Sequence, residues 1–507
     1  MNASQSPLFE PVLWEDTGFK ILDEVRLPES IEYISVTEVS QALDAVREMK
    51  TRAFGQVLTF LYSGALMARQ YNEKEPAPLR ERIARMTQQF CDARPTFDFR
   101  GLGSNFDQWF ETLKNDDPFV GDSIARKACE FGGYIVQARY TRAKRAASIL
   151  PANACVLTHC NVSGELVAVA AHCGEMGKEI AFVATETRPY LQGTRLTAWE
   201  LAQAGVAVSL IPDSAIAQVM AKGKVNAVIV GADRSARNGD VINKVGTYPI
   251  ALMAREYGIP FYALVQDPRS LNEGSEVYIE ERSASELLTF QGKSLLAGGN
   301  HEITARYPAF DVTPGGLITH LVGFEDLYTP ETYRERFHYQ PAANGGKPKQ
   351  RGKFVMVYGI PTIDQLRFLS NELRVERGET ILVPEMRPQL WGAQNVAPAL
   401  LSQKLPTTLI SDNMMGTLCA QGEIRKLCLF YEAMKDQGPR GICGSLLAVQ
   451  LARLHGVPIE ILPGDGHPGP AIDRDAATFL GLKVCPEGVS VPVVENEIVP
   501  WALLSDG

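Results

Sequence analysis

The sequence predicts an α/β protein: a mainly helical N-terminal cap with a short β-hairpin, then a doubly wound, Rossmann-like parallel sheet, then a degenerate copy of that sheet. Three observations predict this. The 507 residues are too many for one hydrophobic core. Strands alternate with helices after about residue 146, and the chain matches itself at a shift of 199 residues. We place the domains at 1–145, 146–339 and 353–507.

The cap is predicted from a change of hydrophobic period. Residues 1–32 include alternating apolar and polar residues with turn formers at Gly18 and Pro28, a pattern typical of a hairpin. From Val36 to about Tyr140 the apolar residues recur at helical spacing, as in VLTFLYSGALMARQY. The cap is therefore expected to be small and mostly helical.

The first α/β domain is predicted from short apolar runs that suit strands buried on both faces. These runs are ACVLTH, EIAFVATE, AVSLIP, NAVIVGAD and PFYALV. Helical stretches such as GELVAVAAHCGEM and YPIALMAREYG lie between them, and Gly205 and Gly258 mark helix ends. Strand–helix alternation of this kind favours a parallel sheet.

The second copy follows a Gly/Pro/Lys-rich stretch at 340–352, which we interpret as a linker. In the aligned copies Arg188-Pro189 meets Arg387-Pro388, and Asp213 meets Asp412. The chemically reactive positions differ between the copies. Cys160 aligns with Gly359, Gln192 with Trp391, Asp233 with Glu432 and Asn243-Lys244 with Gly441-Ile442. We therefore expect chemistry in the first copy only.

Composition excludes several classes of protein. A net charge of −9 argues against a surface for nucleic acid or anionic membrane. The nine cysteines show no metal-site spacing and no disulfide pattern, and the N-terminus resembles no signal peptide. No apolar run is long enough to span a bilayer. We expect a cytoplasmic protein without a metal site.

Two reactive residues follow predicted strands. Cys160 comes after an apolar run and before a polar loop that leads into a helix, whose N-terminus would lower the pKa of a thiol. Asp233 ends the apolar run AVIVG, where a carboxylate suits a site better than a core. In an open α/β sheet ligands bind at this edge. His159 alternates to the opposite face from Cys160, so we interpret it as structural.

The strings LTHCN, TRPYLQGTRLTAWEL and VGADRSARNGDVINKVGTY together resemble the methylthioribose-1-phosphate isomerase family, which is related to the regulatory subunits of eukaryotic translation initiation factor 2B. The resemblance implies that Cys160 and Asp233 are catalytic. It also implies that the substrate-binding residues are Arg52, Ala53, Phe54, Arg94, Gln192, Asn243 and Lys244.

The chain departs from the family pattern at two places. The family's phosphate loop reads Arg-Gly-Ala-Pro-Ala-Ile-Gly, whereas residues 52–58 here read Arg-Ala-Phe-Gly-Gln-Val-Leu. After Arg94-Pro95-Thr96 the family continues Ala-Val-Asn-Leu, whereas residues 97–100 are Phe-Asp-Phe-Arg. These changes leave the substituent at sugar C5 open.

The implied reaction converts an aldose 1-phosphate to a ketose 1-phosphate, as in methionine salvage, with no cofactor. Asp233 would protonate the ring oxygen. Cys160 would act as a thiolate base at C2, or its thiol would assist a direct hydride shift from C2 to C1. Two alternatives are a ribose-1,5-bisphosphate-type isomerase, for which Arg100 is the one favourable feature, and a non-enzymatic regulatory protein.

Members of the family pair as homodimers through the α/β domain. We expect either such a homodimer or an intrachain pseudo-dimer, in which residues 353–507 take the place of the partner subunit. Besides the sugar phosphate, the sequence indicates no other partner.

Overall fold

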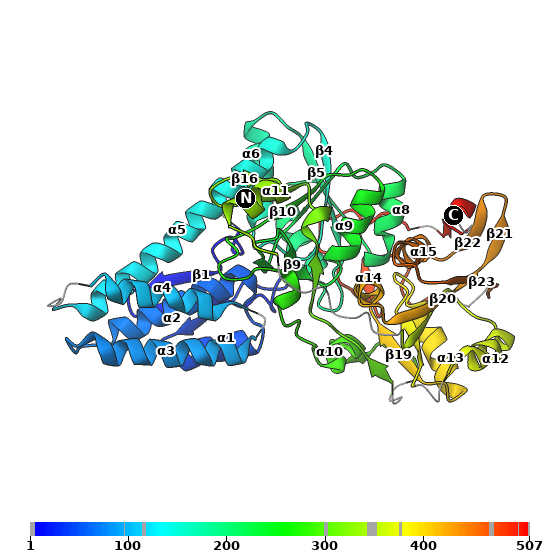
Figure 1. Cartoon of the computed structure of the whole chain (residues 1–507), viewed down its shortest axis with the longest axis horizontal. Helices are drawn as coiled ribbons and strands as arrows, with labels where there is room; N and C mark the ends of the chain where they lie inside the picture. The colour runs from blue at the N-terminus through cyan, green and yellow to red at the C-terminus, as the bar shows by residue number, and fades with distance from the viewer. Residues whose placement is uncertain are drawn as a thin grey trace.

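The computed structural model describes residues 6–95, 97–113, 118–298, 303–341, 352–374, 378–465, 471–494 and 496–504. Most of the expected linker, at 342–351, lies outside these ranges. Three parts follow one another along the longest axis of the molecule (Figure 1). They are a helical cap, a central α/β unit and a second α/β unit.

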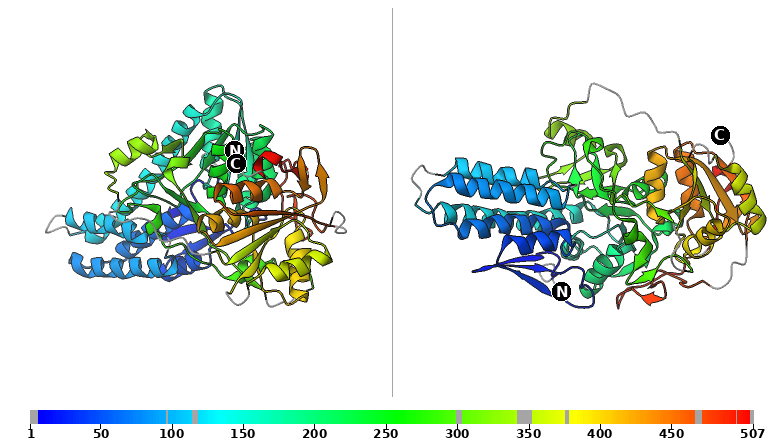
Figure 2. Two further views of the ribbon diagram at one scale, coloured as in Figure 1. Left: turned by 45° about the vertical axis from the view of Figure 1, so that its right-hand side comes forward. Right: turned by 90° about the horizontal axis from the view of Figure 1, so that it is seen from below.

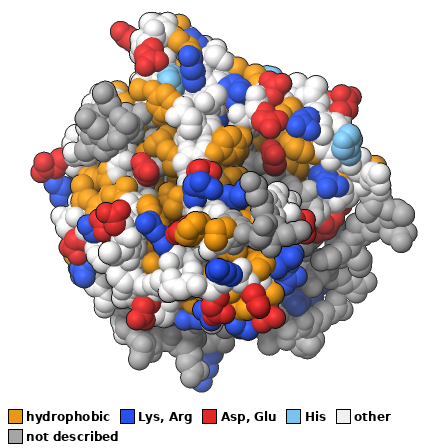
Figure 3. Space-filling model, turned by 90° about the vertical axis from the view of Figure 1, so that its left-hand side faces the viewer, with side chains coloured by type: hydrophobic (Ala, Val, Ile, Leu, Met, Phe, Trp, Pro, Cys, Tyr) orange, Lys and Arg blue, Asp and Glu red, His pale blue; other side chains and the backbone are white. Residues whose placement is uncertain are grey.

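The cap combines a small antiparallel sheet with helices. The expected hairpin is formed by β1 (Val12–Glu15) and β2 (Gly18–Leu22), and β3 (Tyr33–Val36) adds a third strand. The helices are α1 (Val39–Arg47), α2 (Ala53–Arg69), α3 (Pro76–Ala93), α4 (Phe99–Glu111) and α5 (Val120–Ile149). Their apolar faces meet around packed rings such as Phe60 against Phe90, with centroids 5.3 Å apart. On the end of the molecule that the cap forms, Lys and Arg are interspersed with Asp and Glu (Figure 3).

Helix α5 connects the cap to the central unit, so residue 145 falls inside a continuous helix. Two arginines on its second half are buried against the α/β unit. Arg142 forms a bidentate ion pair with Glu165, with Nε–Oε1 and Nη2–Oε2 distances of 2.7 Å. Arg139 donates from Nη2 to the Ser163 carbonyl at 2.6 Å. The cap is thereby fixed to the loop that follows residue 160.

The central sheet has seven strands in the order β16-β15-β10-β7-β4-β5-β6. Their bounds are β4 (Ala154–Thr158), β5 (Ile180–Thr185), β6 (Val208–Ile211), β7 (Ala227–Val230), β10 (Phe261–Leu264), β15 (His320–Val322) and β16 (Leu327–Tyr328). All neighbours pair in parallel except β16, which confirms the predicted parallel sheet. Strand order reverses between β4 and β7, the point where open α/β sheets bind ligands.

Both faces of this sheet are covered, because side chains alternate along each strand. Val156 contributes to a core with α5, α6 (Glu165–Glu175) and α7 (Trp199–Gln203). Leu157, the next residue, contributes to a core with α8 (Ile216–Ala221) and α9 (Thr247–Glu256). The second core continues into the second α/β unit.

A small antiparallel sheet flanks the binding edge. It contains β8 (Arg234–Ser235), β9 (Val241–Lys244) and β14 (Phe310–Thr313). Asp311 on β14 accepts hydrogen bonds from the backbone N–H groups of Gly246 at 2.7 Å and Tyr248 at 3.1 Å. These groups lie at the start of α9, where N–H groups lack partners within the helix.

The second unit, coloured mainly yellow to orange, contains a sheet of its own (Figure 2). This parallel sheet has six strands in the order β13-β19-β18-β17-β20-β23. Its strands are β17 (Phe354–Tyr358), β18 (Thr380–Pro384), β19 (Thr407–Ile410), β20 (Ile424–Tyr431) and β23 (Ile459–Pro463), joined by β13 (Thr304–Ala305) from the central unit. The order β19-β18-β17-β20-β23 is the same as β6-β5-β4-β7-β10. The helices are α12 (Ile363–Glu372), α13 (Ala397–Ser402), α14 (Met415–Ala420) and α15 (Ser445–Leu454).

The remaining elements are short. Beside the second sheet lie β21 (Ala433–Lys435), β22 (Gly438–Gly441) and β26 (Glu497–Ile498). Elsewhere are α10 (Ala284–Leu288), α11 (Pro330–Arg336), β11 (Thr289–Phe290), β12 (Lys293–Ser294), β24 (Thr478–Phe479) and β25 (Leu482–Lys483). None of the helices in the described ranges is both long and apolar enough to cross a bilayer.

The two units exchange backbone at their edges. The central unit contributes β13 to the edge strand β19 of the second sheet. In return, Ser490 pairs with the edge strand β6: its N–H donates to the Val208 carbonyl at 3.0 Å, and its carbonyl accepts from Leu210 at 2.8 Å. Helix α8 packs on α15 and α9 packs on α14. The contacts are therefore reciprocal.

Two buried ion pairs between the central and second units are likewise reciprocal, each unit providing one arginine and one glutamate. Arg188 Nε lies 2.9 Å from Glu385 Oε1, and Arg387 Nη2 lies 2.8 Å from Glu186 Oε2. The four side chains are at most 1% exposed. Loss of one partner from such a pair leaves an uncompensated buried charge, which typically costs about 3–5 kcal/mol. At both pairs the contact between the units is thus closed to solvent.

Candidate active site

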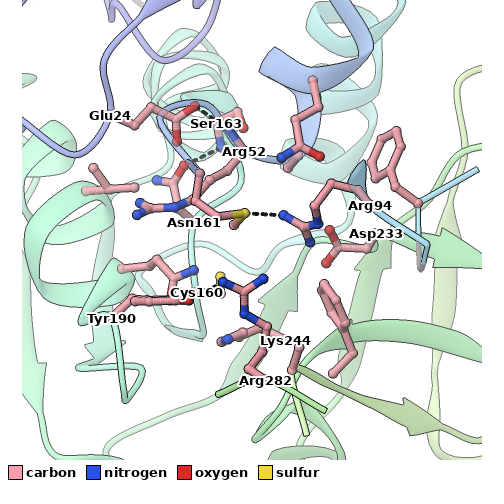
Figure 4. A pocket seen from close by; sticks show the side chains of 18 of the residues that line it. Glu24, Arg52, Arg94, Cys160, Asn161, Ser163, Tyr190, Asp233, Lys244 and Arg282 are labelled. Atoms are coloured by element: carbon pink, nitrogen blue, oxygen red, sulfur yellow. Dashed lines mark hydrogen bonds between the residues drawn. The ribbon is translucent and has the colours of Figure 1, made fainter. Parts of the chain in front are cut away.

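A buried cavity of about 60 Å³ lies where the cap meets the switch point of the central sheet. Cys160 reaches it from the loop after β4, and Asp233 reaches it from the loop after β7 (Figure 4). The cap contributes Arg52 at the start of α2 and Arg94 at the end of α3. The central unit thus supplies Cys160 and Asp233, and the cap supplies two arginines.

Cys160 has a left-handed backbone conformation with φ of +65°. Such a conformation is uncommon for a residue other than glycine, and it persists only where surrounding contacts enforce it. The Cys160 N–H donates to Thr187 Oγ1 at 2.9 Å, and the Cys160 carbonyl accepts from Thr197 Oγ1 at 2.6 Å. The surroundings therefore fix the backbone that carries the thiol.

The expected lowering of the thiol pKa is wrong. Burial raises the pKa of Cys160 to about 12, although the nearby Lys244 ammonium opposes this rise. Helix α6 begins only at Glu165, and desolvation outweighs any effect of its dipole. At neutral pH the free protein holds Cys160 as a neutral thiol.

Asp233 and Lys244 have shifted pKa values of opposite direction. Burial raises the pKa of Asp233 to about 6, against the lowering effect of the Arg94 and Lys244 cations. Burial lowers the pKa of Lys244 to about 8, against the raising effect of Cys160 and Asp233. Lys244 Nζ also donates to Tyr307 OH at 2.5 Å. Near neutral pH the site combines a readily protonated carboxyl with an ammonium ion.

The two arginines provide donors for an anion. Among the described residues, Arg52 Nε and Arg94 Nε are buried without a hydrogen-bond partner. Arg94 Nε lies 3.6 Å from Glu280 Oε2, and Arg94 also contacts the Met49 sulfur. Planar guanidinium groups with unused N–H donors suit a phosphate.

Seven of the nine residues proposed from the sequence line the cavity: Arg52, Ala53, Arg94, Cys160, Gln192, Asp233 and Lys244. Phe54 and Asn243 do not. Phe54, one position after Ala53 on α2, turns away and lies under Arg139, whose Cζ is 4.0 Å from the ring centroid. Asn243 precedes Lys244 on β9 and points to the opposite face, where its Nδ2 donates to Thr247 Oγ1 at 2.9 Å.

Several lining residues were not predicted from the sequence. Glu24 lies beside Arg52, and burial raises its pKa to about 7. Tyr190 accepts a hydrogen bond from Arg282 Nη2 at 3.1 Å, and Arg282 pairs with Glu280 and Glu286. Tyr190 had a signal, because it lies two residues before Gln192 in the TRPYLQG string. Glu24, Arg282 and Tyr307 come from distant segments that carry no such signal.

His159 is buried on the other side of the strand end, as expected. Its ring bonds Thr185 Oγ1 at 2.7 Å and the Val245 carbonyl at 2.9 Å. Burial lowers its pKa to about 4, so the ring is neutral. No group of three or more side chains suited to a metal ion occurs among the described residues.

Comparison with known proteins shows which family this chain belongs to. The model of the initiation factor 2 subunit family matches residues 56–323, more than half of the chain. The chain belongs to the initiation factor 2 subunit family. Among its relatives, methylthioribose-1-phosphate isomerase from Desulforudis audaxviator is 37% identical over 332 residues, which cover 62% of this chain and 92% of the relative. The same-named protein from Thermotoga neapolitana is 32% identical over 339 residues, 62% of this chain and 94% of the relative.

Two solved structures show a similar fold over about two thirds of this chain. The 5-methylthioribose 1-phosphate isomerase from Pyrococcus horikoshii superposes with a TM-score of 0.56 at 28% identity, covering 67% of this chain and 99% of that one. Translation initiation factor eIF-2B subunit delta from A. fulgidus gives 0.54 at 30% identity, covering 63% and 96%. The chain is therefore similar both to proteins named as isomerases and to a protein named as an initiation-factor subunit.

Proposed function

We propose that this protein is an aldose–ketose isomerase that converts 5-methylthioribose 1-phosphate, or a close 5-deoxypentose 1-phosphate, to the ketose 1-phosphate. The observation that carries the proposal is the convergence of Cys160, Asp233 and Lys244 with two arginines in one buried cavity at the switch point. A regulatory subunit has no need of that set. The relatives named as isomerases support the same assignment.

The cations and the apolar residues of the cavity suit the two ends of this substrate. Arg52, Arg94 and Lys244 would hold the phosphate. Apolar side chains, Met49, Phe97, Leu196 and Phe310, suit a methylthio group. A ribose 1,5-bisphosphate would need a second cationic site, but Arg100 is exposed and does not line the cavity. Arg282 does line it, but its charge is already paired with Glu280 and Glu286. The structure therefore favours a substrate with one phosphate.

In our mechanism Asp233 provides the proton. A bound phosphate dianion raises the pKa of Asp233 above its free value of about 6, so the carboxyl is protonated in the complex. Asp233 donates this proton to the ring oxygen, and the bond between C1 and the ring oxygen breaks. A hydride then moves from C2 to C1, and the Asp233 carboxylate recovers the proton of the C2 hydroxyl. No net proton is gained or lost.

Cys160 assists as a thiol in this route. With a pKa of about 12, the thiolate that a proton-abstraction route needs is a small minority at neutral pH. The polarizable sulfur would instead stabilise positive charge that develops at C1. A neutral thiol at Cys160 therefore favours the hydride shift over proton abstraction through an enediolate.

The experiment that tests the function follows purified protein with 5-methylthioribose 1-phosphate by ³¹P NMR, beside parallel samples containing ribose 1-phosphate and ribose 1,5-bisphosphate. We expect the 5-methylthio substrate to have the highest kcat/KM. Preferred turnover of the bisphosphate would replace the substrate assignment. Absence of turnover of all three by folded protein would contradict isomerase function.

We predict that kcat/KM decreases with pH in two steps. The acid form of Asp233 is lost above a pH of about 6, and the charge of Lys244 is lost above about 8. Because kcat/KM reports groups of the free enzyme, both pKa values should appear in a profile measured from about pH 5 to 10. Lys244→Arg should remove the upper step, and a profile that stays flat across pH 6 would exclude Asp233 as the acid.

We also propose that residues 353–507 are a degenerate second copy that takes the place of a dimer partner. The equal strand order, the backbone pairing exchanged at the sheet edges and the reciprocal Arg–Glu pairs support this pseudo-dimer. The prediction is a monomer of 55.6 kDa in sedimentation equilibrium at micromolar concentration. A stable species of twice that mass would contradict it.

A further inference from the structure

The second unit contributes no residue to the cavity wall among the described residues, yet it contacts the segment that holds the Cys160 backbone. That segment is Glu186-Thr187-Arg188, directly after β5. Thr187 Oγ1 accepts the Cys160 N–H at 2.9 Å. Any displacement of Thr187 therefore reaches the backbone of the thiol.

Thr187 itself is held by Asp213. The carboxylate accepts from the Thr187 N–H through Oδ1 and from the Arg188 N–H through Oδ2, both at 2.8 Å. Thr187 has a left-handed conformation with φ of +59°, which a β-branched residue adopts only under constraint. Asp213 supplies that constraint from within the central unit.

Asn413 of the second unit completes the arrangement. Its Oδ1 accepts from Ser411 Oγ at 2.6 Å, which directs the Nδ2 group toward the central unit. Nδ2 donates to the Arg188 carbonyl and to Asp213 Oδ2, both at 3.0 Å. Asn413 is 2% exposed, so water does not replace these bonds readily.

The ion pair between Glu186 and Arg387 also holds this segment against the second unit. Glu186 precedes Thr187 and is bound by Arg387 of the second unit through Nε at 3.0 Å and Nη2 at 2.8 Å. The segment is thus held from the second unit at its side chain by Arg387 and at its backbone by Asn413. Both contacts are buried.

We propose that the second unit keeps the Cys160 loop in its catalytic geometry, with Asn413 as the positioning residue that acts through Asp213 and Thr187. The unit without chemistry of its own thereby becomes a required part of the active site. A displacement of about 1 Å is enough to cost as much as 10²-fold in rate.

The pseudo-symmetry offers a matched control. Ser214 is the counterpart of Asn413, and its Oγ donates to the Arg387 carbonyl at 2.9 Å. Ser214 is fully buried at the same contact between units. It holds the segment of the second unit, whereas Asn413 holds the segment beside Cys160. Ser214→Ala therefore loosens the contact without releasing Thr187.

The test compares Asn413→Ala with Ser214→Ala in the full-length protein, using kcat and KM, the denaturation midpoint, and the rate at which iodoacetamide alkylates Cys160, followed by peptide mass spectrometry. In Asn413→Ala we expect kcat to fall about 10-fold, with KM within about twofold, and Cys160 alkylation to change at least about threefold. Ser214→Ala should keep both rates within about twofold. Asn413→Ser serves if the alanine variant does not fold, because it carries the counterpart's side chain.

Equal behaviour of the two variants in kcat and in alkylation would overturn the proposal. The kinetic measurement rests on the proposed isomerase function, but the alkylation measurement does not. If wild-type protein has no isomerase activity and Asn413→Ala still changes Cys160 alkylation selectively, the function fails and the positioning role stands.

Discussion

Replacing Cys160 with serine should lower kcat for the isomerase reaction by at least about 10²-fold while the protein remains folded. Oxygen is less polarizable than sulfur, so a hydroxyl would stabilise the developing charge at C1 poorly. It is also a weaker acid than a thiol, so it would not replace a thiolate base either. The backbone bonds to Thr187 and Thr197 do not involve the side chain and are kept. The measurement is kcat at saturating substrate together with the thermal denaturation midpoint.

Cys155→Ser provides the matched control for this variant. Cys155 lies five residues earlier, on β4, and packs against the core outside the cavity. Its substitution should leave kcat within about twofold. If Cys160→Ser retained turnover near the wild-type value, the thiol would have no role in the reaction.

Replacing Asp233 with asparagine should reduce kcat by about 10³-fold or more, within the range that general acid–base groups contribute. The amide N–H is far too weak an acid to protonate the ring oxygen. Phosphate binding should be kept or improved, because the substitution removes a negative charge beside Arg94 and Lys244. We therefore expect substrate affinity, measured by isothermal titration calorimetry, to be at least equal to that of the wild type.

Glu432→Gln is the control for the aspartate. Glu432 occupies the position in the second unit that aligns with Asp233. Each makes an equivalent backbone hydrogen bond within its own unit: the Asp233 N–H donates to the Ile242 carbonyl, and the Glu432 N–H donates to the Arg440 carbonyl. Full activity is expected, since Glu432 does not line the cavity. Substantial loss in Glu432→Gln together with turnover in Asp233→Asn would reverse our assignment of chemistry to the first unit.

The strands and helices of the central unit could be predicted because each follows from a local pattern. Strands β4 to β7 are short, largely apolar runs. Strands β4, β5 and β6 pair in sequence order, and β7 pairs with the other side of β4. Cys160 and Asp233 could be placed for the same reason, since parallel strands bring their carboxyl ends to one edge. In the central unit the local sequence pattern is therefore enough to predict the strands and the position of these two residues.

Other features depend on long-range packing and were missed or misplaced. Asn243 is an exception, because strand alternation alone separates it from Lys244: Lys244 faces the cavity, and neighbours on a strand point apart. Substrate binding by Asn243 stays a prediction. Glu24 and Tyr307 reach the cavity only because the cap and the segment between β13 and β14 pack there. The raised pKa of Cys160 likewise follows from the depth of burial, which no spacing of residues reveals.

The most direct test of the account is to incubate the protein with 5-methylthioribose 1-phosphate in D₂O and record the product by ¹H NMR. We predict a ketose 1-phosphate whose C1 carries the hydrogen transferred from C2 and no deuterium. Deuterium at C1 would keep the isomerase assignment but replace the hydride shift by proton abstraction at C2. Unchanged substrate after prolonged incubation with folded protein would contradict the central claim that this site is an isomerase.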